Sequence, residues 1–102
     1  MDVKYSVDKD KLYIYMSGEL DESNARSAKS EIDDIIDSNM EVKNVIFNFS
    51  HLSFMDSTGI GVLLGRYKKL KKLKTSAYIQ SPGVSVNKIL QISGIYEVMP
   101  KI

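Results

Sequence analysis

The first part of the chain alternates between apolar and polar residues, and this alternation predicts strands. In the segment KLYIYM every second residue is apolar, namely Leu12, Ile14 and Met16, which is the two-residue period of a strand with one buried face. Residues 3–7 alternate in the same way, and the intervening Asp8-Lys9-Asp10 suits a turn. We therefore expect the chain to open with a β-hairpin.

A helical period follows the hairpin. Apolar residues recur three or four positions apart at Ala25, Ala28, Ile32, Ile35 and Ile36, which predicts a one-sided helix. The helix should continue to about Ser38, with Asn39 as a stop signal. Its N-terminus would be capped by the side chain of Asp21 or Ser23, either of which can accept a hydrogen bond from an unpaired backbone N–H.

The second half of the chain alternates between strand and helix patterns. Residues 44–49 hold an apolar run that is typical of a central strand buried on both faces. We then expect a helix from about Ser57 to Lys72, a strand over 76–80, a helix between Ser81-Pro82-Gly83 and Gly94, and a final short strand over 96–99. This order predicts an α/β fold, a mixed, mostly parallel sheet of about five strands with helices packed on it.

The helix over 57–72 has an unusual outer face. The core should receive the stripe Ile60, Leu63, Leu64, Tyr67, Leu70 and Leu73. The opposite side would then carry Thr58, Gly61, Val62, Gly65, Lys69 and Lys72. A glycine inside a helix costs about 1 kcal/mol relative to alanine. The glycines could admit another element of the same fold, but their position beside Ser57 favours a flat surface for a partner.

Composition and charge narrow the functional classes. A chain of 102 residues with 43% hydrophobic content suits one domain. The net charge of +1 argues against bulk binding to nucleic acid. The lysines over 68–74 and the acidic group Asp33, Asp34 and Asp37 are interpreted as solvated helix faces. No apolar run approaches the roughly 18–20 residues that a membrane span needs, and we expect a cytoplasmic protein.

Ser57 is the residue with the most specific chemical position. A hydroxyl at the start of a helix faces unpaired N–H groups and the positive end of the helix dipole, where a phosphate is held well. Ser57 could equally be an ordinary N-cap residue. If it were phosphorylated, it would gain roughly −1.5 to −2 charges at pH 7. The helix N-terminus would tolerate that charge, and Asp56 would oppose it.

The sequence contains no motif that indicates an enzyme active site, a metal site or a cofactor site. His51 is the single histidine, and we expect it in the same loop as Ser57. It would have to act as the base of a serine hydrolase, with no oxyanion-hole motif before it. The segment Gly59-Ile60-Gly61 has neither the Walker nor the dinucleotide-binding spacing. The chain has no cysteine, and the three aspartates lack a calcium-loop pattern. We expect no catalytic residue, no cofactor and no metal site.

The segment FMDSTGIGVLLGRY over 54–67 resembles the signature of the STAS-domain anti-sigma factor antagonists, in particular those that act on a sporulation sigma factor. Gly18-Glu19-Leu20-Asp21, Ser81-Pro82-Gly83-Val84 and Ile92-Ser93-Gly94 match the family pattern in order and spacing. The resemblance covers nearly the whole chain and implies a single STAS domain over 1–102. Family members usually continue into a last helix, which we expect to be absent or shortened here.

The resemblance implies a function. The unphosphorylated antagonist would bind an anti-sigma factor that is also a serine kinase, and the sigma factor would be released. The kinase would then phosphorylate Ser57, and a PP2C-type phosphatase would remove the phosphate. The chain would be their substrate and not an enzyme, and it would be a monomer by itself. The expected partner-binding residues are Asp21, Asp56, Thr58, Gly59, Gly61, Val62 and Gly65.

Other functions remain open. The resemblance also admits a general-stress or stressosome-type regulator, the regulatory domain of an anion transporter and a nucleotide-binding STAS module. The basic turn Lys71-Lys72-Leu73-Lys74-Thr75 lacks the glycines common in the family and could add an electrostatic contribution to docking on an acidic partner.

Overall fold

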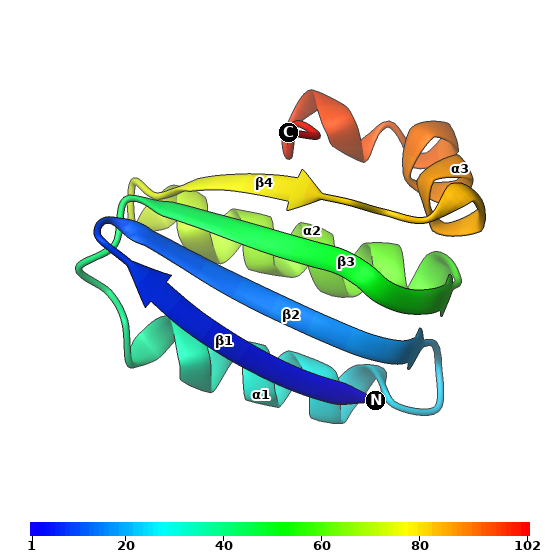
Figure 1. The fold of residues 1–102 in the computed structure, drawn as a ribbon, viewed down its shortest axis with the longest axis horizontal. Helices are drawn as coiled ribbons and strands as arrows, with labels where there is room; N and C mark the ends of the chain where they lie inside the picture. Colours follow the sequence, from blue (N-terminus) through cyan, green and yellow to red (C-terminus); the bar gives the residue numbers. More distant parts are fainter.

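The computed structural model describes residues 1–102 as one sheet with helices on one face and along one edge (Figure 1). The elements are β1 (Asp2–Asp8), β2 (Lys11–Leu20), α1 (Ala25–Asp37), β3 (Asn44–Met55), α2 (Ser57–Lys72), β4 (Ser76–Gln80), α3 (Val84–Ser93) and the 3₁₀ helix η1 (Ile95–Glu97). The strands lie in the order β1-β2-β3-β4. β1 runs antiparallel to β2, and the other two pairs are parallel. The predicted α/β fold with a mixed, mostly parallel sheet is confirmed.

The opening hairpin forms as the alternation predicts. Val7 pairs with Leu12 and Asp8 with Lys11, and Lys9 in the turn has a φ of 59°. The side chains of Leu12, Ile14 and Met16 are buried. β2 continues beyond the predicted strand to Leu20 and carries bulges on the way. It therefore ends beside the beginning of α2, where Asp56 N donates to Leu20 O over 3.3 Å.

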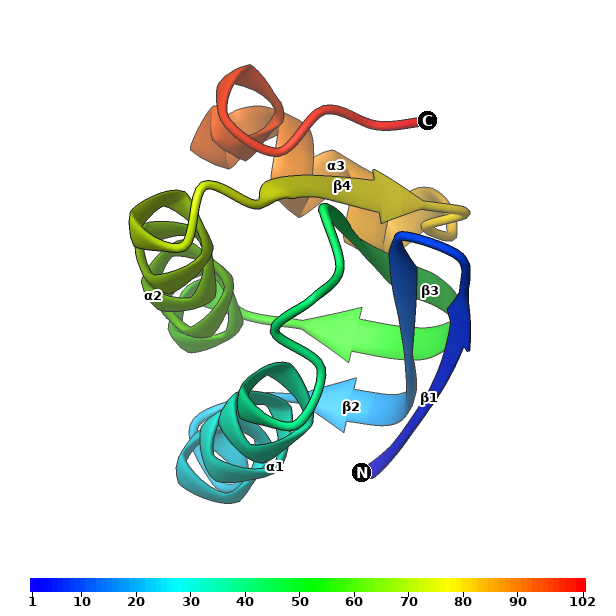
Figure 2. The same ribbon diagram turned by 90° about the vertical axis from the view of Figure 1, so that its left-hand side faces the viewer.

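The helices form two groups around the sheet. Figure 2 shows α1 and α2 side by side on one face of the sheet. α3 lies beyond the end of β4 and packs mainly against β3 (Figure 1), and the chain after η1 returns to β4, where Lys101 bridges to Ile79. The core lies between the sheet and these helices. Its fully buried side chains include Ile14, Phe47, Ile79, Ile32, Leu63 and Leu90. No helix combines the length and the apolar character needed to cross a membrane.

The predicted strand over 96–99 is wrong. Gly94, with a φ of 77°, ends α3, and the chain turns directly into η1. Met99 N donates to Ile95 O over 2.8 Å, so these two buried residues lie at the four-residue spacing of a helical turn. Only Lys101 pairs with Ile79 of β4, in a single parallel bridge. The sheet therefore has four strands and not about five.

The predicted core stripe of α2 needs correction at two positions. Leu63 and Leu70 are buried as expected, but Leu64 is 36% exposed and Val62 only 8%. Arg66 is buried as well. The physical reason is that α2 packs against α1 in addition to the sheet, so its buried surface extends toward residues 62 and 66.

Candidate functional site

Ser57 is the first residue of α2 and lies immediately beyond the end of β3. Its side chain is exposed. The cap of α2 is Asp56, whose Oδ1 accepts a hydrogen bond from Gly59 N over 3.1 Å. Because the neighbouring aspartate performs the capping, the Ser57 hydroxyl is not needed for it. Ser57 is thus an exposed residue at the start of a helix that begins where the sequence predicted.

Asp56 also joins α2 to the loop that precedes α1. Its Oδ2 accepts from Glu22 N over 3.3 Å, across 34 positions of sequence. The two oxygens of one carboxylate thus satisfy an N–H group of α2 and an N–H group of the loop. This contact brings the loop over 21–24 next to the start of α2, where Ser57 lies.

The loop itself is held by short-range hydrogen bonds. The Asp21 carboxylate accepts from Ser23 N over 2.9 Å and from Ser23 Oγ over 2.6 Å. The Asn24 side chain accepts from Asp21 N over 3.0 Å and donates to Glu19 O over 2.6 Å. Neither Asp21 nor Ser23 caps α1, which begins after Asn24 without a side-chain cap. That prediction is wrong because Asp21 and Ser23 hydrogen-bond to each other.

The hydrogen bond from the Ser23 hydroxyl is the main cause that lowers the pKa of Asp21 below its ordinary value of 3.8. Backbone hydrogen bonds from Ser23 and Asn24 act in the same direction, and partial desolvation opposes them. The loop beside Ser57 therefore presents a carboxylate at neutral pH.

The three glycines of α2 have different surroundings. Gly59 is buried, and a Cβ added there would lie 2.6 Å from Met55 Cγ and 3.1 Å from Leu20 O. A Cβ added at Gly61 or Gly65 would meet no atom within 4 Å. Gly59 is thus explained by close packing at the helix start, whereas Gly61 and Gly65 leave open space at the surface.

A shallow groove of about 500 Å³ runs between α1 and α2. From α2 it is lined by the predicted residues Thr58, Gly61, Val62 and Gly65. The remaining lining residues are Ala25, Arg26, Lys29 and Arg66. The structure therefore brings four of the predicted residues into one groove, with Asp56 at the cap of α2 and Asp21 in the adjoining loop. Gly59 does not line the groove.

Sequence reasoning missed the basic residues of this groove. Arg66 is part of the segment that carries the resemblance, but a helical wheel centred on the core stripe gave it no role. Arg26 and Lys29 fall on the polar side of the predicted first helix, where charged residues are ordinary. Only the packing of α1 on α2 makes the three side chains neighbours.

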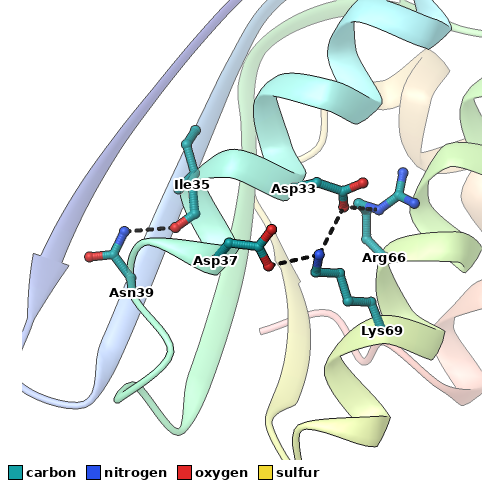
Figure 3. Close-up of polar contacts among 6 residues, drawn as sticks. All are labelled: Asp33, Ile35, Asp37, Asn39, Arg66 and Lys69. Carbon is teal, nitrogen blue, oxygen red and sulfur yellow. Dashed lines mark hydrogen bonds and ion pairs between the residues drawn. The ribbon is translucent and has the colours of Figure 1, made fainter.

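The acidic residues of α1 are also placed differently from the prediction of a solvated face. Figure 3 shows Asp33 and Asp37 facing Arg66 and Lys69 of α2. Asp33 Oδ1 lies 2.9 Å from Arg66 Nε, and Asp37 Oδ1 lies 2.8 Å from Lys69 Nζ. Two of the three aspartates therefore join α1 to α2.

His51 lies inside β3, opposite Ser17 of β2, and is exposed. Sequence reasoning had placed it in a loop. Four strand positions separate His51 from Met55 at the end of β3, which corresponds to about 13 Å of extended backbone. This separation leaves Ser57 without a histidine base and argues against a serine hydrolase.

Comparison with known proteins finds similarity over nearly the whole chain. A family model described as STAS domain matches residues 2–102. The anti-sigma F factor antagonist of Paenibacillus polymyxa is 30% identical over 89 residues, which cover 87% of this chain and 75% of the relative. The solved structure of SpoIIAA, an anti-sigma factor antagonist in its unphosphorylated form, has a TM-score of 0.80 at 30% identity and covers 99% of this chain and 88% of that chain. The structure of the Bacillus cell fate determinant SpoIIAA in its phosphorylated form has a TM-score of 0.71 at 29% identity. It covers 99% of this chain and 91% of that chain.

Proposed function

The chain belongs to the STAS domain family, and from this premise we propose that it is an anti-sigma factor antagonist that phosphorylation of Ser57 switches off. One observation carries the proposal. The Ser57 hydroxyl is exposed at the start of α2, while Asp56 performs the capping that would otherwise occupy it. A kinase can therefore reach the hydroxyl without opening the helix.

In the proposed cycle the unphosphorylated chain binds an anti-sigma factor that is also a serine kinase, and the sigma factor is released. The kinase transfers the γ-phosphoryl group of ATP to Ser57 Oγ, and a PP2C-type phosphatase hydrolyses the resulting ester. The chain itself supplies no catalytic group. Its relatives are named as antagonists, a regulatory class and not an enzymatic one.

The physical consequence of phosphorylation is a change of surface and not of fold. Backbone N–H groups at the start of α2 and the helix dipole favour an anion at Ser57, while the Asp56 carboxylate repels it. A partner selected for the unphosphorylated surface then loses affinity through like-charge repulsion and desolvation. The phosphorylated SpoIIAA structure, which shares this fold, supports a domain that survives the modification.

We propose that the partner surface includes Asp21, Thr58, Gly61 and Gly65. Three further residues would support this surface without facing the partner directly. Gly59 and Val62 are buried, and Asp56 is the N-cap of α2. Relatives named anti-sigma F factor antagonists match 87% of this chain, and those named anti-sigma-B factor antagonists match 56%, which favours a partner of the sporulation type over one of the general-stress type. Binding to anti-sigma factors of each type would separate these two pathways.

The test is the intact mass of the chain after incubation with the cognate anti-sigma kinase and Mg-ATP. We expect one added phosphate on the wild type and on the matched control Ser85→Ala, an exposed serine of α3 outside the proposed surface, and none on Ser57→Ala. Unphosphorylated wild type should bind the kinase, and the phosphorylated form should bind more weakly. A phosphate on Ser57→Ala, or equal binding of both forms, would contradict the proposal.

A further inference from the structure

Arg66 of α2 is a buried cation with unused hydrogen-bonding capacity. Its side chain is only 8% exposed, and its Nε lies 2.9 Å from Asp33 Oδ1 (Figure 3). Yet neither of these two atoms, nor Arg66 Nη1, has a partner in hydrogen-bond geometry. Lys69 Nζ approaches the same Asp33 oxygen to 3.9 Å. The Asp33 carboxylate thus lies near two cations. The buried guanidinium keeps an unpaired donor, which lowers the stability of the fold.

The groove that Arg66 lines carries only positive charge. Arg26 and Lys29 line it from α1, and no acidic residue is among its lining residues. Asp33 and Asp34 line a neighbouring hollow together with Ser30, and this hollow shares Arg26 and Lys29 with the groove. The ion pairs of the structure involve neither Arg26 nor Lys29. The two side chains are therefore available to an incoming anion.

The α2 side of the groove allows a close approach. At Gly61 and Gly65 the space that a Cβ would occupy has no neighbour within 4 Å. A segment laid along this side could bring its own side chains close to the helix and toward Arg66. Arg66 Nε and Nη1 are themselves covered, so an incoming carboxylate would meet the guanidinium at Nη2, where a charge-assisted hydrogen bond is strong.

We propose that the groove between α1 and α2 receives an acidic segment of the anti-sigma factor, with one carboxylate on the Arg66 guanidinium and a neighbouring carboxylate between Arg26 and Lys29. This inference rests on the proposed function, because it specifies the chemistry of that partner. It also gives the switch an electrostatic basis. Thr58 lines the groove, so a phosphate on the adjacent Ser57 adds negative charge at the end of a site that takes a carboxylate.

The groove can be tested without the partner by using hexaglutamate as a probe and hexaglutamine as its neutral counterpart. We expect hexaglutamate to shift the amide NMR signals of Gly61 and Gly65 in a saturable way that weakens as salt is raised. In the double variant Arg26→Gln/Lys29→Gln the affinity should fall at least about tenfold. The matched control Lys68→Gln/Lys88→Gln removes two exposed lysines that lie outside the groove and form no ion pair, and it should bind as the wild type does. Shifts that gather at Lys71 and Lys72, equal affinities in both variants, or no binding would overturn the inference.

Binding to the cognate anti-sigma factor then separates this inference from the proposed function. We expect Arg26→Gln/Lys29→Gln to bind it at least about tenfold more weakly, with an unchanged melting temperature, and the lysine control to bind normally. Equal binding of wild type and Arg26→Gln/Lys29→Gln would contradict the binding of an acidic segment in the groove and would leave the proposed function intact. Saturable hexaglutamate binding at the groove in a wild-type chain that binds no anti-sigma factor would support the carboxylate site and contradict the proposed function.

Discussion

Gly59 and Met55 are so close that a Cβ on the glycine would lie 2.6 Å from Met55 Cγ. The same Cβ would lie 3.1 Å from the backbone oxygen of Leu20, which cannot move without shifting β2. Alanine at this position should therefore cost about 1–3 kcal/mol through overpacking, offset by about 1 kcal/mol of gained helix propensity. We expect Gly59→Ala to lower the free energy of unfolding by up to about 2 kcal/mol, as measured by urea denaturation.

The control for this prediction is Gly65→Ala on the same helix. A Cβ there meets no atom within 4 Å, so alanine should raise the free energy of unfolding by up to about 1 kcal/mol. Opposite signs at the two glycines are the expected result. If both substitutions stabilised the protein, close packing would not be the reason for glycine at residue 59.

Asp56 holds two elements with one carboxylate, and its removal should affect both. Asp56→Ala loses the cap bond to Gly59 N and the bond to Glu22 N. We expect a cost of about 1–2 kcal/mol in the free energy of unfolding, together with faster amide hydrogen exchange at Gly59 and Glu22. Asp56→Asn keeps an acceptor oxygen and should retain most of the cap. Equal losses in the two variants would show that charge, and not the cap, is the important property.

The elements that the sequence predicted well are those encoded by local patterns. The alternation around Ile14 is enough to predict the first part of β2, since a strand with one buried face requires that period wherever it lies in the sheet. The bounds of α2 followed from Asp56 and Ser57 at its start and from the helical period behind them. The exposed hydroxyl of Ser57 could be predicted from the same local signals, because the first turn of a helix leaves its N–H groups toward solvent.

The features that were missed depend on contacts between distant segments. Val62 and Leu64 could not be assigned correctly because the buried side of α2 is set jointly by the sheet and by α1. Arg66 looks like an ordinary surface arginine until the fold places Asp33, 33 positions earlier in the sequence, 2.9 Å from its Nε. The segment around Ile95 has the composition of a strand, but it forms a helical turn because Gly94 turns the chain there.

Asp33 should contribute more to the free energy of unfolding than its exposed neighbour Asp34. Asp33→Asn would leave the buried Arg66 without its only opposite charge, and breaking a buried ion pair in this way costs about 3–5 kcal/mol. Since the Asp33 side chain is 24% exposed, solvent screens part of that cost, and we expect a loss of about 1–3 kcal/mol. The matched control Asp34→Asn, a position without an ion pair, should stay within about 0.5 kcal/mol of the wild type. Similar free energies of unfolding for the two variants would contradict a structural role for the Asp33–Arg66 contact.

Asp21 should titrate below its ordinary pKa of 3.8 because of the hydrogen bond from the Ser23 hydroxyl. A lowered pKa in the folded state means that the carboxylate stabilises the fold above about pH 3.8 and that this contribution is lost as the pH falls through the lowered value. We expect Ser23→Ala to raise the pKa of Asp21 toward 3.8, as followed by NMR titration of the side-chain carboxyl carbon. Ser27→Ala is the matched control, because the Ser27 hydroxyl donates to Asn24 O and does not contact Asp21. A pKa that did not move in Ser23→Ala, or that moved as much in Ser27→Ala, would show that the Ser23 hydroxyl is not what lowers it.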